Sequence, residues 1–268
     1  MNEEAALPKG RRKLVAVVRA AGDIVHIADA ERVLDISRAD AAKLLSRWSG
    51  QGWMRRVGPG AYAPVGLTSL GSQQVLDDPW VLVPALYDPA YIGGRTAAEH
   101  WDLTEQLFRD IVVVTGRPVR ARTQERHGTT FSLRHIRPDM IFGTRSVWRG
   151  TTRIAVSDVH RTIVDMLDDP ALGAGIQHVS DCIAAYFDRR DRDDDKLLTY
   201  ADRLGNGAVF KRLGFLAERG SDGSELVAAC QERLTQGNAK LDSALPCRRL
   251  ITRWRLFVPD GWHRVAPA

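Results

Sequence analysis

Residues 27–65 carry the pattern that most restricts the possible folds, namely two short helices followed by a hairpin. A helix is expected over residues 28–34, and Asp35 and Ile36 turn the chain. Ser37 can cap a second helix, with Asp40 three positions later as its partner in a capping box. One face of that helix is an apolar stripe with the spacing that buries a helical surface. The stripe consists of Ala41, Leu44, Leu45 and Trp48.

The hairpin follows the second helix directly. Residues 53–57 and 61–65 flank Gly58, Pro59 and Gly60, which are residues typical of tight turns between strands. Two helices and such a hairpin indicate a winged helix-turn-helix. In that fold the second helix enters the major groove of DNA and the wing lies along phosphates or in the minor groove. The alternative is a winged helix that mediates protein contacts only.

Basic residues lie on the predicted DNA-binding elements. We expect Arg38 and Lys43 nearest the base edges, and Arg55 and Arg56 on phosphates. The complete expected DNA face is Arg38, Lys43, Arg47, Arg55, Arg56 and Tyr62. Before or at the start of an earlier amphipathic helix, four further cations form either a phosphate-binding arm or a solvated basic face. They are Lys9, Arg11, Arg12 and Lys13.

The charge distribution supports a DNA-binding N-terminus. The net charge is +5, and residues 1–65 hold eleven Lys and Arg against seven Asp and Glu. Residues 66–268 hold twenty-seven Lys and Arg against twenty-six Asp and Glu. Most of the excess positive charge therefore lies on the segment expected to contact DNA.

The length of 268 residues allows one large or two modest domains. We place a boundary near residues 67–78, between a winged helix-turn-helix domain (1–70) and a larger domain (80–268). Strands are expected over residues 110–115, 129–136, 145–148 and 153–156. A helical half follows, with helices over 158–167, Ile176–Phe187, 196–204, 208–218 and 224–234 and a strand pair around 250–258. The expected fold class is therefore α+β, with a winged helix-turn-helix followed by a mixed α/β domain.

A second basic segment lies in the larger domain. Residues 108–153 hold ten Lys and Arg against three Asp and Glu. If these arginines share a face, they form a surface for an anionic partner, which can be DNA, RNA or an acidic protein patch. The interleaved aromatic side chains either stack on bases or pack in the core. They are Phe131, His135, Phe142 and Trp148.

Motifs for catalysis and cofactor binding are absent. The sequence contains no P-loop, no zinc-protease motif, no nucleophile elbow and no convincing dinucleotide fingerprint. The histidines lack metal-ligand spacing, and the acidic run at 188–195 is read as a solvated loop before a helix rather than a metal site. We therefore expect a binding protein, not an enzyme, with no cofactor and no metal.

Localisation follows from the cysteines and the apolar runs. Cys182, Cys230 and Cys247 are sparse and widely spaced, which indicates a reducing compartment. The N-terminus lacks the apolar core of a signal peptide, and the longest apolar run, residues 80–86, is too short to span a bilayer. A cytoplasmic protein that does not bind membranes is expected.

Residues 157–165 form a well-defined helix start. Ser157 or Asp158 can cap the helix, and Arg161 and Asp165 are spaced four residues apart for a salt bridge on one face. A catalytic role for His160 would require a nucleophile and an orienting acid, and the sequence identifies neither. We interpret this segment as structural.

At these residues the chain resembles the AbiEi-type antitoxins. Four stretches carry the resemblance and together cover most of residues 10–220: the winged helix ending at 58–62, residues 91–106, the Asp-x-x-Arg-Thr-x-x-Asp core of 157–165, and residues 211–216. The chain departs from the family pattern at His160, where an acidic residue is common, and at Arg95, where a serine is common.

The resemblance implies two roles, neither of them catalytic. The winged helix would repress the operon's own promoter at repeated DNA sequences, and the larger domain would counter a partner nucleotidyltransferase-like toxin. A basic surface suits such a partner, whose active site holds carboxylates and a nucleotide. We expect this surface at Arg120, Arg122 and Arg126, extended by Lys211 and Arg212. Binding the toxin directly and countering it indirectly both remain open.

Two other functions remain open. One is a winged-helix transcription factor whose larger domain senses a small ligand, which requires a pocket. The other is an enzyme that processes nucleic acid on the basic segment of residues 108–153.

Overall fold

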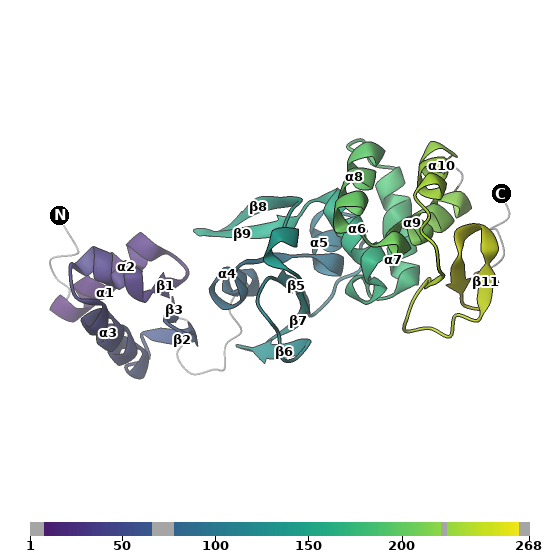
Figure 1. The fold of residues 1–268 in the computed structure, drawn as a ribbon. Coiled ribbons are helices and arrows are strands. Elements are labelled where there is room, and N and C mark those ends of the chain that lie inside the picture. The colour runs from purple at the N-terminus through teal and green to yellow at the C-terminus, as the bar shows by residue number, and fades with distance from the viewer. Residues whose placement is uncertain (1–7, 66–77, 221–223, 263–268) are drawn as a thin grey trace.

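The chain adopts a mixed α+β fold with several sheets, seen here in a computed structural model that describes residues 8–65, 78–220 and 224–262. Along the long axis lie an N-terminal unit, a central sheet and a helical half (Figure 1). The domain boundary expected at 67–78 lies, except for Asp78, outside the described residues. Among the described helices, none is long and apolar enough to cross a membrane.

The N-terminal unit contains the helices and the hairpin that the sequence predicts. Its sheet has the order β1-β3-β2, with antiparallel neighbours. The two-residue β1 was not predicted, because so short a strand has no periodicity to detect. The elements are α1 (Lys9–Ala21), β1 (Val25–His26), α2 (Ile27–Leu34), α3 (Arg38–Gly50), β2 (Met54–Gly58) and β3 (Ala61–Pro64).

Capping and burial of α3 agree with the predicted pattern. The Ser37 hydroxyl accepts a hydrogen bond from the Asp40 amide, so Ser37 is the cap. The Asp40 carboxylate accepts a hydrogen bond from the Ser37 hydroxyl at 2.8 Å. In a standard capping box it would accept from the Ser37 backbone amide instead. Ala41, Leu45 and Trp48 are buried in the core of the unit, with Leu44 packed against them.

A six-stranded mixed sheet with the order β6-β7-β5-β4-β9-β8 forms the middle of the molecule. The neighbours β5 and β7 are parallel, as are β4 and β9, and the remaining pairs are antiparallel. All five residues of β5 are buried, as their apolar, β-branched run predicts. The strands are β4 (Ala90–Ile92), β5 (Ile111–Thr115), β6 (Thr123–Arg126), β7 (Thr129–His135), β8 (Thr144–Arg149) and β9 (Thr152–Ser157).

Helix α6 (Val159–Asp168) is the central element of the helical half, because every residue from Val159 to Leu167 is buried. Gly214 lets its helix, α9 (Gly207–Arg219), approach the C-terminal segment, since a Cβ at Gly214 would lie 2.1 Å from the Trp254 ring. The other elements after the N-terminal unit are α4 (Leu82–Tyr87), α5 (Gly94–His100), α7 (Ile176–Phe187), α8 (Asp194–Leu204), α9 (Gly207–Arg219), α10 (Ser224–Glu232), β10 (Ala239–Lys240), β11 (Arg249–Ile251) and β12 (Leu256–Val258).

The N-terminal unit and the central sheet share an apolar cluster. Val57 and Ala63 of the hairpin pack in the same buried cluster as Leu82 of α4 and Phe131 of β7. This cluster fixes the hairpin against the larger part of the chain.

Hydrogen bonds reinforce this packing at two places. The Asp23 carboxylate accepts from the backbone amide of Thr151 at 2.8 Å and from its hydroxyl at 3.0 Å, so it joins the α1–β1 turn to the β8–β9 hairpin. His127, in the β6–β7 turn, contacts the Val57 carbonyl of β2 through Nε2 at 3.1 Å. The N-terminal unit is therefore held at both edges of the sheet.

A buried polar triad ties α6 to the sheet. Arg161 donates from Nε to Asp165 at 2.8 Å, which confirms the predicted salt bridge, and its side chain is fully buried. Tyr91 of β4 donates to Asp165 at 2.8 Å and accepts from Arg161 at 3.1 Å. Burial raises the pKa of Tyr91 well above its ordinary value, so its hydroxyl remains a donor.

Replacing Asp165 with alanine should strongly destabilise the fold. The change leaves the Arg161 guanidinium buried without its counter-ion, so the free energy of unfolding in urea should fall by about 3–5 kcal/mol. Asp202→Ala is the matched control, because Asp202 pairs with Arg233 at the surface and about 1 kcal/mol or less is expected. Equal losses in the two variants would contradict the central role of the triad.

Candidate nucleic-acid interface and basic cavity

The exposed face of α3 carries three of the expected DNA-binding side chains. Arg38, Lys43 and Arg47 are all exposed. Arg38 lies in the first turn with 72% of its side chain exposed, and its ion pair with Glu31 is long, at 3.9 Å. Because the opposite face of α3 is buried in the core, these cations project from the unit.

The hairpin contributes Arg56 but not Tyr62. Arg56 is exposed, with Nε 3.4 Å from the Gly58 carbonyl, and Arg55 is half-buried. Tyr62 is 6% exposed and packs in the core of the N-terminal unit, so its expected place on the DNA face is wrong. In β3, Tyr62 alternates with Ala61 and Ala63, which pack in the apolar cluster shared with the central sheet. Both faces of this short strand are therefore buried.

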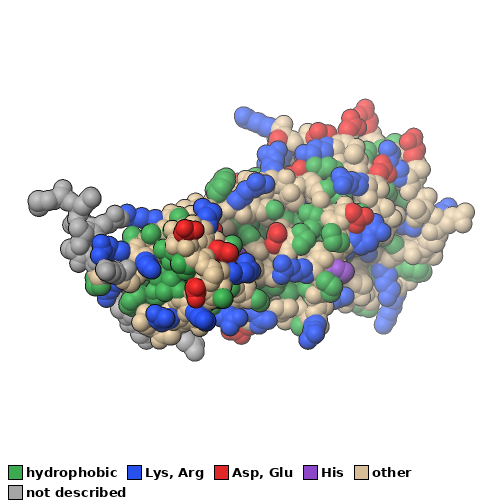
Figure 2. Space-filling view, turned by 60° about the vertical axis from the view of Figure 1, so that its left-hand side comes forward, with side chains coloured by type: hydrophobic (Ala, Val, Ile, Leu, Met, Phe, Trp, Pro, Cys, Tyr) green, Lys and Arg blue, Asp and Glu red, His purple; other side chains and the backbone are tan. Residues whose placement is uncertain are grey.

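Arg11 and Arg12 belong to the first turns of α1 rather than to an extended arm. Both are exposed, and the Arg11 guanidinium lies 5.8 Å from the centre of the Trp53 ring, just before β2. The contact places Arg11 beside the hairpin. Lys and Arg side chains are spread over the face of the molecule seen in Figure 2, many of them along its lower edge.

Lys211 and Arg212, expected on a partner-binding surface, are buried. Lys211 donates to the Gly237 carbonyl at 2.8 Å. Arg212 donates to the carbonyls of Leu167 at 2.6 Å and Lys240 at 3.0 Å. These bonds tie α9 to the end of α6 and to β10. The prediction was wrong because a basic pair on an amphipathic helix gives no sign that backbone carbonyls will cover it.

The basic segment of residues 108–153 does not form one continuous face, but part of it lines a cavity. The cavity has a volume of about 610 Å³ and lies between β7, the chain leading into β6 and the 3-10 helix Pro170–Gly173. We call it the basic cavity. The basic and hydroxyl side chains that line it are Arg95, Arg120, Arg122, Ser132, Arg134 and His135. Arg126 lies outside it, at the end of β6, where it contacts Gln124 and the Glu125 carbonyl.

Acidic residues hold two of these arginines in place. Arg95 forms an ion pair with Asp110, and Ser132 donates to the same carboxylate at 2.5 Å. Burial opposes ionisation of Asp110, but the hydrogen bonds from Ser132 and Arg95 outweigh it, so its pKa is lowered. Arg134 pairs with Asp168 and Asp169.

The sequence identified Arg120 and Arg122 but did not group them with the other lining residues. Arg95, Ser132 and Arg134 come from α5 and β7, and only the tertiary structure brings them together. Of the four aromatic side chains in this region, Phe131 and Phe142 are buried, whereas Trp148 is 63% exposed on β8.

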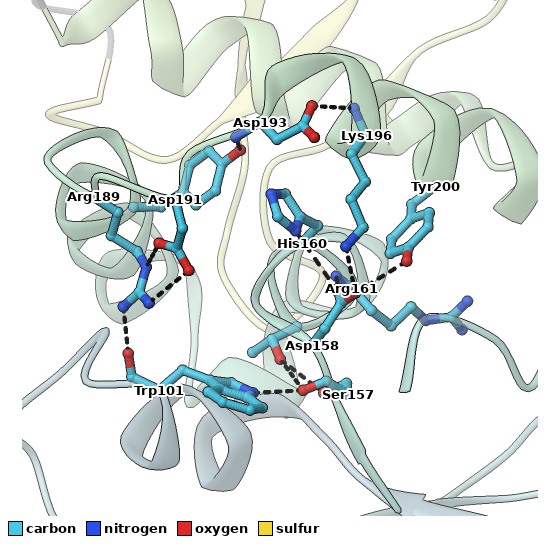
Figure 3. A network of polar contacts seen from close by, with 12 residues as sticks. Trp101, Ser157, Asp158, His160, Arg161, Arg189, Asp191, Asp193, Lys196 and Tyr200 are labelled. Atoms are coloured by element: carbon cyan, nitrogen blue, oxygen red, sulfur yellow. Dashed lines mark hydrogen bonds and ion pairs between the residues drawn. The ribbon is translucent and has the colours of Figure 1, made fainter. Parts of the chain in front are cut away.

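A second polar cluster surrounds the start of α6 (Figure 3). Asp158 caps the helix by accepting from the Arg161 amide at 2.9 Å, and it also binds the Lys196 ammonium at 2.9 Å and the Tyr200 hydroxyl at 3.0 Å. His160 is 6% exposed, and within the described residues neither ring nitrogen has a hydrogen-bond partner. Burial lowers its pKa and favours the neutral ring.

The acidic loop above this cluster is engaged in local structure. Asp191 binds Arg189 at 2.7 Å, Asp194 binds Arg192 at 2.7 Å, and Asp193 caps α8. Among the described residues no group of three His, Cys, Asp or Glu side chains could hold a metal ion. The contacts around α6 and α8 are those of a structural cluster that packs the two helices together.

Neutralising Asp110 should remove a pH-dependent part of the stability. Because its pKa is lowered on folding, the carboxylate stabilises the fold above about pH 4, and the contribution is lost as pH falls through the lowered value. Asp110→Asn should thus be less stable than wild type at pH 7 in urea denaturation, by a margin that shrinks towards pH 3. Asp139→Asn, at an exposed ion pair, is the control. A margin independent of pH would contradict this assignment.

Comparisons with known proteins show a similarity of fold and none of sequence family. No protein-family model and no curated protein matches the sequence. The structure is similar to the crystal structure of the RV2827C protein from Mycobacterium tuberculosis, with a TM-score of 0.57 and 14% sequence identity, over 94% of this chain and 92% of that chain. Nearly the whole architecture, from the N-terminal unit to the helical half, is therefore shared with a solved protein.

Proposed function

We propose that the chain is a DNA-binding transcriptional autorepressor and antitoxin of the cytoplasm, in which the N-terminal unit is a winged helix-turn-helix. The observation that carries the DNA-binding role is the set of exposed cations on α3. Arg38, Lys43 and Arg47 project from a capped helix that follows a short turn from α2 and precedes a basic hairpin. This order of elements supports the proposal of a recognition helix followed by a wing.

The positions of the cations suggest a division of roles. Arg38 and Lys43, near the start of α3, suit contacts with base edges, since recognition helices approach the major groove with their N-terminal residues. Arg56 on β2 and Arg11 on α1 lie towards the hairpin and suit phosphates. A single module of this size reads few base pairs, which favours two or more copies on repeated half-sites of its promoter.

The antitoxin role rests on the larger domain and on the resemblance to AbiEi-type antitoxins. Arg120, Arg122 and Arg126 are exposed along β6 and the chain before it, so they offer positive charge to a toxin whose cleft holds carboxylates and nucleotide phosphates. The proposal covers both direct binding of the toxin and indirect protection.

A winged-helix regulator with a ligand-sensing larger domain is the second candidate function. The basic cavity favours it over a nucleic-acid-processing enzyme, because the cavity has room for a small anionic ligand.

Substitutions on α3 and on β2 should affect DNA binding differently. Arg38→Ala or Lys43→Ala should weaken binding to DNA from the chain's own promoter by about 1–3 kcal/mol, through lost base contacts. Arg56→Ala should weaken binding to all DNA sequences equally. It should also reduce the slope of log K for binding against log salt concentration by about one unit. Fluorescence anisotropy with promoter and scrambled duplexes at several salt concentrations measures both effects.

Arg137→Ala is the control for these variants, because Arg137 is exposed on the larger domain and pairs with Asp139. It should bind the promoter duplex as wild type does. Full-strength binding by an Arg38→Ala/Arg47→Ala protein would refute the placement of the DNA face.

Charge reversal in the larger domain should separate rescue from repression. The variant Arg120→Glu/Arg122→Glu/Arg126→Glu should lose protection of cells that express the neighbouring toxin, because like charges would then face each other, and it should keep promoter binding. The full chain is used because the apolar cluster joins the N-terminal unit to the sheet, so a truncation at residue 80 would expose Leu82 and Phe131.

The reciprocal variant completes this test. Arg38→Ala/Arg47→Ala should protect cells from the toxin while failing to repress the promoter. The proposed separation of roles would be contradicted if Arg38→Ala/Arg47→Ala failed to protect cells from the toxin while the charge-reversal variant still protected them.

A further inference from the structure

We propose that the basic cavity binds a small phosphate ester of nucleotide size. The inference does not depend on DNA binding, but two arginines of the cavity, Arg120 and Arg122, also belong to the surface proposed above for the toxin. The volume of about 610 Å³ lies within the range of small-molecule sites, roughly 300–1,000 Å³.

The charges lining the basic cavity are those of four arginines and of one carboxylate, Asp169. Arg95 is bound to Asp110 and to the backbone carbonyls of the 3-10 helix, and Arg134 is paired with Asp168 and Asp169, so the charges of both arginines are balanced and their positions are fixed. Arg120 and Arg122 are exposed, and among the described residues their guanidinium groups have no ion pair or hydrogen bond. The cavity therefore combines fixed arginines in its wall with two uncompensated arginines at its rim.

An unsatisfied donor lies in the cavity wall. Nη1 of Arg134 is buried and, within the described residues, has no hydrogen-bond acceptor. A carboxylate oxygen of Asp169 lies 3.5 Å away, in a loose ion pair, while Asp169 accepts from the Ala171 amide at 3.2 Å. A buried donor without an acceptor is costly. Because this nitrogen has almost no exposed surface, a ligand oxygen reaches it only after the Arg134 side chain turns towards the cavity.

The donor chemistry favours phosphate over other anions. Guanidinium groups offer paired N–H donors that match phosphate oxygens, and His135 adds an imidazole. Val119 and Leu172 give the cavity an apolar side on which a flat ring can pack. A phosphate with an attached ring, as in a nucleotide, uses both the charged and the apolar side of the cavity.

Isothermal titration calorimetry on the full chain tests the proposal, with ATP, GTP, AMP and pyrophosphate as ligands and adenosine as the uncharged probe. At least one phosphate compound should bind wild type while adenosine does not. The variant Arg120→Gln/Arg122→Gln should bind it about tenfold or more weakly, because two charge-assisted contacts are lost. Arg126→Gln is the matched control and should stay within about twofold of wild type, because Arg126 lies outside the cavity.

Three results would overturn the proposal. They are no binding of any phosphate compound at millimolar concentration, equal weakening by Arg120→Gln/Arg122→Gln and by Arg126→Gln, and binding of duplex DNA alone. Thermal unfolding of each variant checks its fold, which these exposed positions should leave unchanged. Promoter binding by wild type is measured in parallel, so failure of the cavity and failure of the DNA-binding role are read separately.

Discussion

The fold depends on a fully buried arginine. Arg161 lies within α6, bonds to Asp165 one turn later and to Tyr91 of β4, and its guanidinium lies 4.0 Å from the centre of the Phe142 ring. It joins the central helix to the central sheet through groups that cannot be left unpaired without a large energetic cost. Helices α5, α7, α8 and α9 all contact α6, so the arrangement of the helical half follows from this attachment.

The second constraint is the apolar cluster that continues from the hairpin into the sheet. Hairpin residues such as Val57 pack with Leu82 and Phe131, and Asp23 holds the β8–β9 hairpin at the other side. The cations of α3 are therefore presented in a fixed orientation relative to β6 and the basic cavity. A DNA-binding role at one end and an anion-binding role in the middle would act on one connected body.

Net charge says little about which cations are available. Lys211 and Arg212 satisfy backbone carbonyls, Arg95 and Arg134 satisfy carboxylates, and Arg161 lies in the core. The charges of these side chains stabilise the fold, and except for the Arg161–Asp165 pair their partners are known only from the folded chain. Exposed cations lie on α3, on β6 and at the cavity rim.

Local periodicity and capping in the sequence determined α3, the β2–β3 hairpin, the buried β5 and the helices from α6 onward, because these depend on residues close in the chain. The Arg161–Asp165 pair was predictable for the same reason. Tertiary structure alone decided that Tyr62, Lys211 and Arg212 are buried, since their covering groups come from distant segments. The tertiary structure also forms the basic cavity, because it brings together side chains from α5, β7 and the chain before β6. These residues are far apart in the sequence, so no local pattern predicts the cavity.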